Sequence, residues 1–180
     1  MAILAREGFS GTSFQKIADT LRISQSAVLY HFSTKESLIE AVILKIIANN
    51  HVVVSGSIKS EDNGRQRLKK HFESNLTWAQ KNPIEAQVII LLYYFACFQE
   101  PFSELYSKVL KGARQRIVDY LHAGQREGLF PKNLQVEMTG QLLHDALLGG
   151  IINAITGSER LAKTTEIRKK WERLFERLLH

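Results

Sequence analysis

Apolar residues recur every three or four positions through most of the chain, the spacing that places them on one face of a helix. A clear stripe of this kind is formed by Leu68, Phe72, Leu76 and Ala79. Strand-like alternation is confined to residues 52–54. We therefore expect an all-α fold, with helices over residues 2–7, 13–21, 25–32, 34–50, 65–82, 84–98, 102–127, 135–156 and 165–179.

Hydroxyl side chains stand before several of these helices. Thr12 with Gln15, and Ser33 with Glu36, have the three-residue spacing of capping boxes, in which each side chain hydrogen-bonds a free backbone N–H. Ser24 is expected to cap the helix that follows it. These capped helices are short and closely spaced near the start of the chain.

Glycines and one polar stretch mark where helices end. Gly8 and Gly128 end two of the predicted helices. Residues 55–64 are polar and contain two glycines, which is typical of a connection between domains. We expect two domains, residues 1–50 and residues 51–180.

The first domain has the pattern of a helix-turn-helix. In such a pair of short helices the second enters the major groove of DNA, and here it is the helix over residues 25–32. Gln25 carries an amide suited to a bidentate contact with adenine, while the small side chains of Ser26 and Ala27 let the helix approach the groove floor. We expect phosphate contacts from Tyr30, His31 and Lys35. For His31, a packed histidine is the alternative.

These residues resemble the DNA-binding domain of TetR-family transcriptional regulators. The likeness is carried by GFSGTSFQKIA (8–18), IS (23–24) and LYHFSTKESL (29–38), and in the second domain by GQREGLF (124–130). The resemblance implies that Thr12 and Ser13 cap the second helix and touch phosphates. The expected DNA-binding residues are Thr12, Ser13, Ser24, Gln25, Ser26, Ala27, Tyr30, His31 and Lys35.

Three positions depart from the family pattern. Arg22 stands in the turn where the family usually has glycine, so we expect a non-glycine residue at positive φ, at a cost of about 1 kcal/mol. Leu29 replaces the usual tyrosine, which removes one phosphate-binding hydroxyl. The first helix, residues 2–7, is shorter than usual and lacks a basic arm, from which we expect a truncated chain or a start codon assigned late.

Charge and composition narrow the function further. The net charge is +6 and the pI about 9.5, which permits a polyanionic partner, although residues 1–50 carry only a small excess of cations. The single cysteine, Cys97, fits a reducing compartment, and we expect a cytoplasmic protein without a secretion signal. The longest apolar run, residues 88–98, is too short to span a bilayer. Motifs for catalysis, cofactors or metal ions are absent from the sequence.

The second domain is rich in aromatic residues. Residues 84–98 are apolar nearly all round, so this helix should be covered on every side. The aromatic side chains either fill the core or enclose a cavity for a mostly apolar effector, as the resemblance suggests. The residues expected around that cavity are His71, Trp78, Tyr93, Tyr94, Cys97, Phe98, Phe102, Tyr106 and His144.

The last two predicted helices have more apolar surface than one core requires, and Gly149-Gly150 allows close helix approach. We expect them to pair with a second copy in a four-helix bundle. The residues expected at this interface are Leu143, Leu147, Gly150, Ile151, Trp171, Leu174 and Leu178.

The leading hypothesis is a homodimeric repressor that binds a palindromic operator and is released by a small molecule. An enzyme built on the second domain, or an interaction protein that no longer binds DNA, are the alternatives. Salt-dependent binding to duplex DNA distinguishes the first from the other two.

Overall fold

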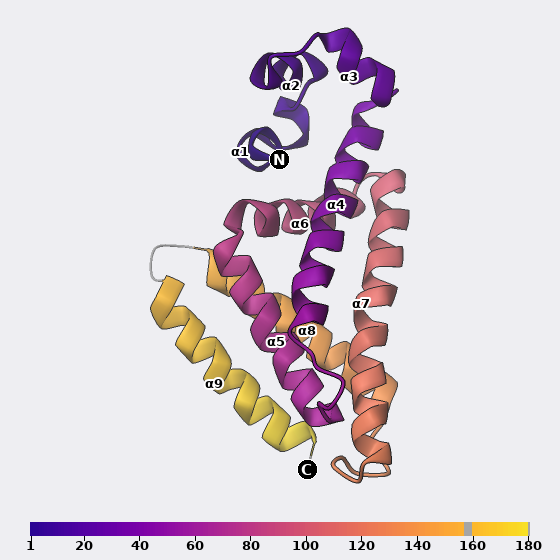
Figure 1. The fold of residues 1–180 in the computed structure, drawn as a ribbon, viewed down its shortest axis with the longest axis vertical. Helices are drawn as coiled ribbons and strands as arrows, with labels where there is room; N and C mark the ends of the chain where they lie inside the picture. The colour runs from indigo at the N-terminus through magenta and orange to yellow at the C-terminus, as the bar shows by residue number, and fades with distance from the viewer. Residues whose placement is uncertain (157–159, 180) are drawn as a thin grey trace. The chain divides into compact units, whose positions relative to one another are not determined.

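The computed structural model describes residues 1–156 and 160–179 (Figure 1). Its elements are α1 (Ala2–Gly11), α2 (Phe14–Leu21), α3 (Gln25–His31), α4 (Lys35–Gly56), α5 (Gly64–Lys81), α6 (Pro83–Ala96), α7 (Glu100–Arg126), α8 (Val136–Ile155) and α9 (Arg160–Leu178). The described residues contain no strand, so the all-α prediction is confirmed.

The helices pack as two compact units. One unit holds residues 1–49 and 83–107, and the other holds residues 50–82 and the chain from residue 108 onward. Each unit therefore combines two stretches of sequence, because α4 and α7 each contribute residues to both. The division into domains 1–50 and 51–180 stays a prediction.

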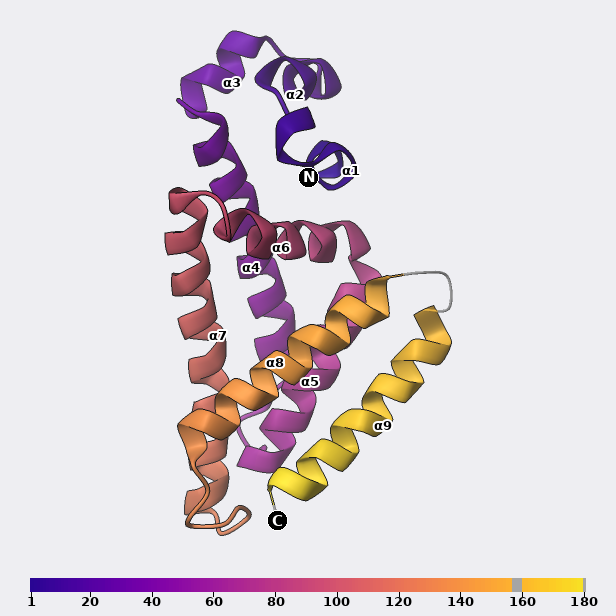
Figure 2. The same ribbon diagram turned by 180° about the vertical axis from the view of Figure 1, so that it is seen from behind.

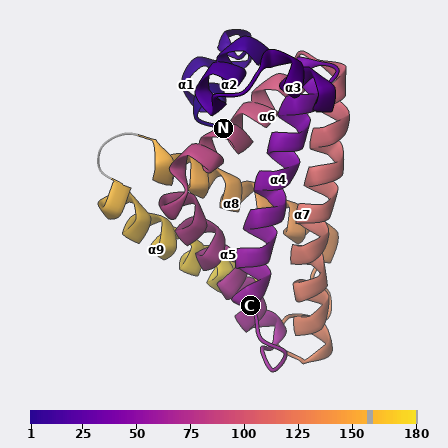
Figure 3. The same cartoon turned by 45° about the horizontal axis from the view of Figure 1, so that its top comes forward.

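In the first unit, α1 packs against α6 through aromatic rings. The ring of Phe9 lies edge-on to Phe95 of α6, at 5.3 Å between centroids, and to Phe102 of α7, at 5.8 Å. The short helices α1, α2 and α3 lie together at one end of this unit (Figure 3), and α2 packs against α3. Phe9 thereby ties the first helix to the longer helices of its unit.

Two backbone turns in this unit match the predictions. Gly8 has φ 66° and interrupts α1, which resumes as a short turn up to Gly11. Arg22, between α2 and α3, has φ 56° and ψ 43°. Among the described residues that are not glycine, it is the one with a positive φ. The expectation that a non-glycine residue takes the left-handed conformation at this turn is confirmed.

Both predicted capping boxes are wrong by one residue. Ser13, not Thr12, caps α2 by accepting from the backbone N–H of Lys16 at 3.2 Å. The Thr12 hydroxyl is unavailable because it donates to the Gly8 carbonyl at 2.8 Å. Before α4 the reciprocal pair is Thr34 and Ser37 rather than Ser33 and Glu36.

In the second unit, α5 packs on α8 and α8 packs on α9 (Figure 2). The buried core consists mainly of Leu68, Phe72, Leu76, Ile117, Leu121, Leu143 and Trp171. Gly64 of α5 allows the closest approach, because a Cβ there would lie 2.3 Å from the backbone nitrogen of Gly124 on α7. The two helices therefore cross backbone to backbone.

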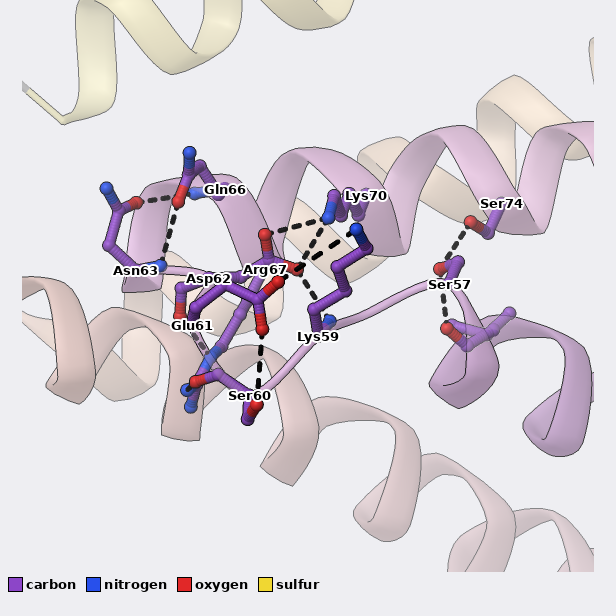
Figure 4. Close-up of polar contacts among 11 residues, drawn as sticks. Ser57, Lys59, Ser60, Glu61, Asp62, Asn63, Gln66, Arg67, Lys70 and Ser74 are labelled. Atoms are coloured by element: carbon purple, nitrogen blue, oxygen red, sulfur yellow. Dashed lines mark hydrogen bonds and ion pairs between the residues drawn. The ribbon is translucent and has the colours of Figure 1, made fainter.

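The connection from α4 to α5 is held by one buried carboxylate (Figure 4). Asp62 accepts from the backbone N–H of Lys59 at 2.7 Å and from the ammonium of Lys70 at 2.6 Å, and the Lys70 hydrogen bond is the main reason that its pKa is lowered. Asn63 and Gln66 then form a complete capping box that begins α5. The predicted polar connection is thus a short ordered loop.

Two apolar helices, α4 and α6, bear on the predictions, and the prediction that α6 is covered on every side is wrong. By length and composition, α4 is apolar enough to cross a membrane, with a mean hydropathy of 1.5 over eighteen residues. Scattered polar residues break up its apolar run, which is why the longest run alone did not reveal it; in the structure, α4 buries Ile39, Ile43 and Ile46. The apolar helix α6 is not covered on every side, because Ile84 and Tyr94 are exposed.

Candidate nucleic-acid interface

The first turn of α3 presents a polar, sterically open surface. Ser24 caps the helix by accepting from the backbone N–H of Ala27 at 3.2 Å, and its hydroxyl also lies 2.9 Å from that of Ser26. Gln25, Ser26 and Ala27 are all exposed, whereas Val28 is buried and anchors the helix. Three consecutive side chains at the start of the helix are therefore available to a partner.

The end of α3 is also exposed. The Tyr30 side chain is 86% exposed, and its ring stacks edge-on against His31 at 5.2 Å. His31 itself is exposed, which is at odds with the alternative of a packed histidine. Both aromatic side chains lie free of the core of their unit, with a hydroxyl and an imidazole facing solvent.

Lys35, the residue expected to clamp a phosphate, already has partners. Its ammonium donates to the Phe9 carbonyl at 3.0 Å and lies 4.0 Å from the centroid of the Phe9 ring. The ring quadrupole and the carbonyl dipole both stabilise the cation at this position. Lys35 therefore joins the start of α4 to the α1 turn, a contact between residues too far apart in sequence to be found by local pattern.

A second lysine joins α1 to α2. Lys16 donates to the Glu7 carboxylate at 2.5 Å and to the Gly11 carbonyl at 3.0 Å. The hydrogen bond from Lys16, followed by that from Arg6, holds the pKa of Glu7 below its usual range. These contacts fix the loop that carries Ser13, which is exposed, while Thr12 is buried and has lost the predicted capping role.

The residues predicted to surround an effector fall in both units. His71, Trp78 and His144 are buried in the second unit. In the first unit, Phe102 is buried and the rings of Tyr93 and Tyr106 lie 4.9 Å apart, whereas Tyr94, Cys97 and Phe98 are exposed. No single unit holds all nine side chains.

The predicted dimer residues divide into buried and half-buried sets. Leu143, Leu147 and Trp171 are buried in the core of their own chain, and their place at a dimer interface stays a prediction. The Trp171 indole N–H donates to the Ala146 carbonyl at 3.2 Å, and its ring fills the space left by Gly150. The half-buried residues are Ile151, Leu174 and Leu178.

A groove of about 520 Å³ runs between α8 and α9 above this packing. It is lined by Ala146, Gly149 and Asn153 of α8 and by Glu166, Lys170 and Leu174 of α9, among others. Gly149 faces open space, since a Cβ there would have no atom within 4 Å. The two glycines of the predicted pair thus have different surroundings.

One family model and several solved structures match this chain. The model of the bacterial regulatory proteins of the tetR family matches residues 1–42. No curated protein matches the sequence. Among solved structures, a TetR transcription regulator from Haloarcula marismortui superposes with a TM-score of 0.84 at 20% identity, covering 99% of this chain and 93% of its own.

Two further structures have the same fold. A transcriptional regulator from Saccharomonospora viridis in complex with choline has a TM-score of 0.84 at 20% identity, with coverage of 97% and 90%. The ketosteroid transcriptional regulator KstR2 of Mycobacterium tuberculosis has a TM-score of 0.72 at 20% identity, with coverage of 99% and 90%. The model of the tetR family therefore matches the first 42 residues, and the chain as a whole has the fold of these solved structures.

Proposed function

We propose that the protein is a homodimeric transcriptional repressor of the cytoplasm, which binds a palindromic DNA operator and is released by a small molecule. The observation that carries this proposal is the exposed first turn of α3, within a helix-turn-helix that matches the family model. Regulators of this family are generally ligand-responsive DNA-binding proteins. Binding to an operator and release by an effector are both part of this proposal.

On DNA, α3 would lie in the major groove with Gln25 on an adenine edge, and with Ser26 and Ala27 against the neighbouring bases. Tyr30 and His31 would contact the backbone, as would Ser13 at the start of α2. Lys35 would contribute a further phosphate contact after leaving the Phe9 carbonyl.

The groove between α8 and α9 supports the proposed dimer. Packing of the same two helices from a second copy against this face would form a four-helix bundle around a two-fold axis. Leu174 and the open surface at Gly149 lie on the face that the groove presents. In such a dimer the two α3 helices would need a separation of about 34–36 Å, one turn of DNA.

The effector would bind in the helical region outside the DNA-binding domain. Release of DNA requires that the ligand bind more tightly to the conformation that does not fit the operator, since equal affinity for both conformations shifts nothing. One of the solved structures is in complex with choline, and another is that of a ketosteroid transcriptional regulator. Both support a small-molecule effector here without identifying it.

The DNA-binding residues can be tested by salt-dependent binding to a duplex that the wild-type protein selects from a random-sequence library. Lys35→Met keeps most of the stem over the Phe9 ring but removes the charge, so it should weaken binding to all sequences and reduce the salt slope by about one. Gln25→Ala should instead relax specificity at one base pair, by about 1–3 kcal/mol. Lys45→Met, an exposed position on the same helix, is the matched control.

Equal losses on selected and random DNA for both variants would show that the proposed groove geometry is wrong. A Lys45→Met variant as weak as Lys35→Met would show that only the net charge matters. If the wild-type chain selects no sequence and shows no salt-dependent binding, the regulator proposal itself fails.

A further inference from the structure

His71 of α5 is a buried histidine with an unused hydrogen-bonding atom. Its side chain is only 4% exposed, and Nδ1 has no hydrogen-bond partner among the described residues. A buried polar atom without a partner costs free energy, and native structures keep few of them. The nitrogen therefore requires a partner that the described part of the chain does not supply.

The polar side chain one turn further along α5 cannot supply it. The Asn75 amide donates to the His71 carbonyl at 2.9 Å, and its oxygen accepts from Asn50 at 3.1 Å. The imidazole ring instead lies against the ring of Tyr120 on α7, at 5.7 Å between centroids. The neighbour of the His71 ring on α7 is therefore an aromatic ring and not a carboxylate.

The charges around His71 are all positive. The pKa of His71 is lowered to about 4, mainly by burial and also by the positive charges of Arg116, His144 and His51. No carboxylate of the described residues acts on it in the opposite sense. His144 is itself buried, and its Nδ1 reaches only Asp145, at 3.5 Å.

Of the three positively charged residues around His71, Arg116 is the one that stays charged at neutral pH. It lies one helical turn before Tyr120, on the same face of α7, and desolvation lowers its pKa. No ion pair or hydrogen bond engages its guanidinium in the described part of the chain, whereas Arg114 on the same helix pairs with Asp145 at 3.1 Å. A half-buried guanidinium without a carboxylate is uncommon, because burial of an unpaired charge is costly.

There is open space beside this guanidinium. A side-chain carbon at Gly112, one turn before Arg116, would have only Nη1 of Arg116 within 4 Å, at 3.9 Å. The glycine thus leaves room next to the unpaired cation.

We propose that Arg116 and His71 form a binding site for the anionic group of the effector, a carboxylate or a phosphate carried on a flat apolar body. The inference rests on the proposed function as a ligand-responsive regulator and deepens it. Arg116 donates to the anion through its planar guanidinium, which matches carboxylate and phosphate oxygens. Nδ1 of His71 completes the contact, and the ring of Tyr120 faces the apolar body.

The proposal distinguishes this protein from its choline-bound relative. A quaternary ammonium ligand would be repelled by Arg116 and gain nothing from His71. Choline therefore serves as a control with the opposite charge. Benzamide serves as a control that has the shape of benzoate but no charge.

The test is calorimetric binding of four probes, benzoate, phenyl phosphate, benzamide and choline, to the full chain at pH 6. We expect the two anions to bind and the other two not to bind. Arg116→Gln should weaken anion binding by about tenfold or more, the size expected for loss of a charge-assisted hydrogen bond, and Arg116→Lys should restore part of it. Lys111→Gln removes an exposed cation from the same helix and should have no effect.

Two further measurements separate a binding role from a structural one. Anion binding should be accompanied by proton uptake that disappears in His71→Leu, because a bound anion favours the protonated imidazole. Gly112→Leu should block anion binding while it leaves every charge in place. If benzamide binds as well as benzoate, if Lys111→Gln weakens binding as much as Arg116→Gln, or if neither anion binds at 10 mM, the proposal is overturned.

Binding to the selected DNA duplex, measured on the same samples, distinguishes this proposal from the proposed function. Salt-dependent DNA binding without any anion binding would remove the anion site and leave the regulator. Anion binding that depends on Arg116, in a protein that selects no DNA sequence, would retain the site and remove the regulator.

Discussion

The neighbouring glycines of α8, Gly149 and Gly150, provide a matched test of the packing between α8 and α9. A Cβ at Gly150 would lie 2.3 Å from Cζ2 of Trp171 and 3.1 Å from Cγ2 of Ile167, both inside van der Waals contact. The Trp171 ring cannot move away without losing contacts, because its N–H donates to the Ala146 carbonyl and its ring packs in a T-shaped pair with Phe72, at 5.0 Å between centroids. Gly149 has no such neighbour.

We expect Gly150→Ala to destabilise the protein and Gly149→Ala to stabilise it. Overpacking of this kind costs about 3 kcal/mol, and replacement of glycine within a helix returns about 1 kcal/mol, which leaves a loss of about 2 kcal/mol for Gly150→Ala. For a chain of this size that corresponds to a fall in Tm of about 4–8 °C. Gly149→Ala keeps only the helix-propensity gain, so its Tm should rise by about 2–4 °C.

The assay is thermal unfolding followed by circular dichroism, with tryptophan emission as a second probe of the Trp171 environment. Two protein concentrations are needed, because dimerisation adds to apparent stability. At the lower concentration the order of Tm should be Gly149→Ala, then wild type, then Gly150→Ala. Equal Tm values for the two variants would refute the packing described for Trp171.

Two other predictions concern the second unit. The free energy of unfolding should fall by about 3 kcal/mol as the pH decreases from about 6.5 to 4. The reason is that the pKa of His71 is about 4 in the fold against 6.5 for the free side chain, so the unfolded chain takes up the proton first. Denaturant titrations at several pH values should show a weaker dependence of this free energy on pH for His71→Leu than for the wild type. Gly64→Ala should cost about 3 kcal/mol, since its Cβ would meet the backbone of Gly124, whereas Gly56→Ala, which meets no atom within 4 Å, should not destabilise.

Local backbone chemistry was the most predictable part of the fold. The positive φ of Arg22 was predicted from the resemblance to a family that usually has glycine in this turn, and the break in α1 was predicted from the glycine at position 8. The cap at Ser24 was predicted correctly, whereas the two capping boxes were missed by one position because adjacent hydroxyls compete for the same role. At Thr12 the outcome depends on a hydrogen bond to Gly8, which no pattern within the helix reveals.

Tertiary partners were the least predictable part. The apolar stripe that contains Trp171 correctly predicted a buried face on α9, but periodicity does not say whether the same chain or a second copy covers that face. The contact of Lys35 with Phe9 joins residues 26 positions apart and leaves no local signal. The unpaired guanidinium of Arg116 is likewise invisible in sequence, because arginine on a helix usually faces solvent.

The contact of Lys35 with Phe9 also has a thermodynamic consequence for the proposed DNA complex. One ammonium cannot at the same time lie over the Phe9 ring and reach a phosphate oxygen, so DNA and the α1 turn compete for it. By linkage, DNA that takes Lys35 loosens the α1 turn to the same extent that an ordered α1 turn weakens DNA binding. Phe9 also stacks on Phe95 and Phe102, so the order of the first twelve residues and the affinity for the operator become two measures of a single equilibrium.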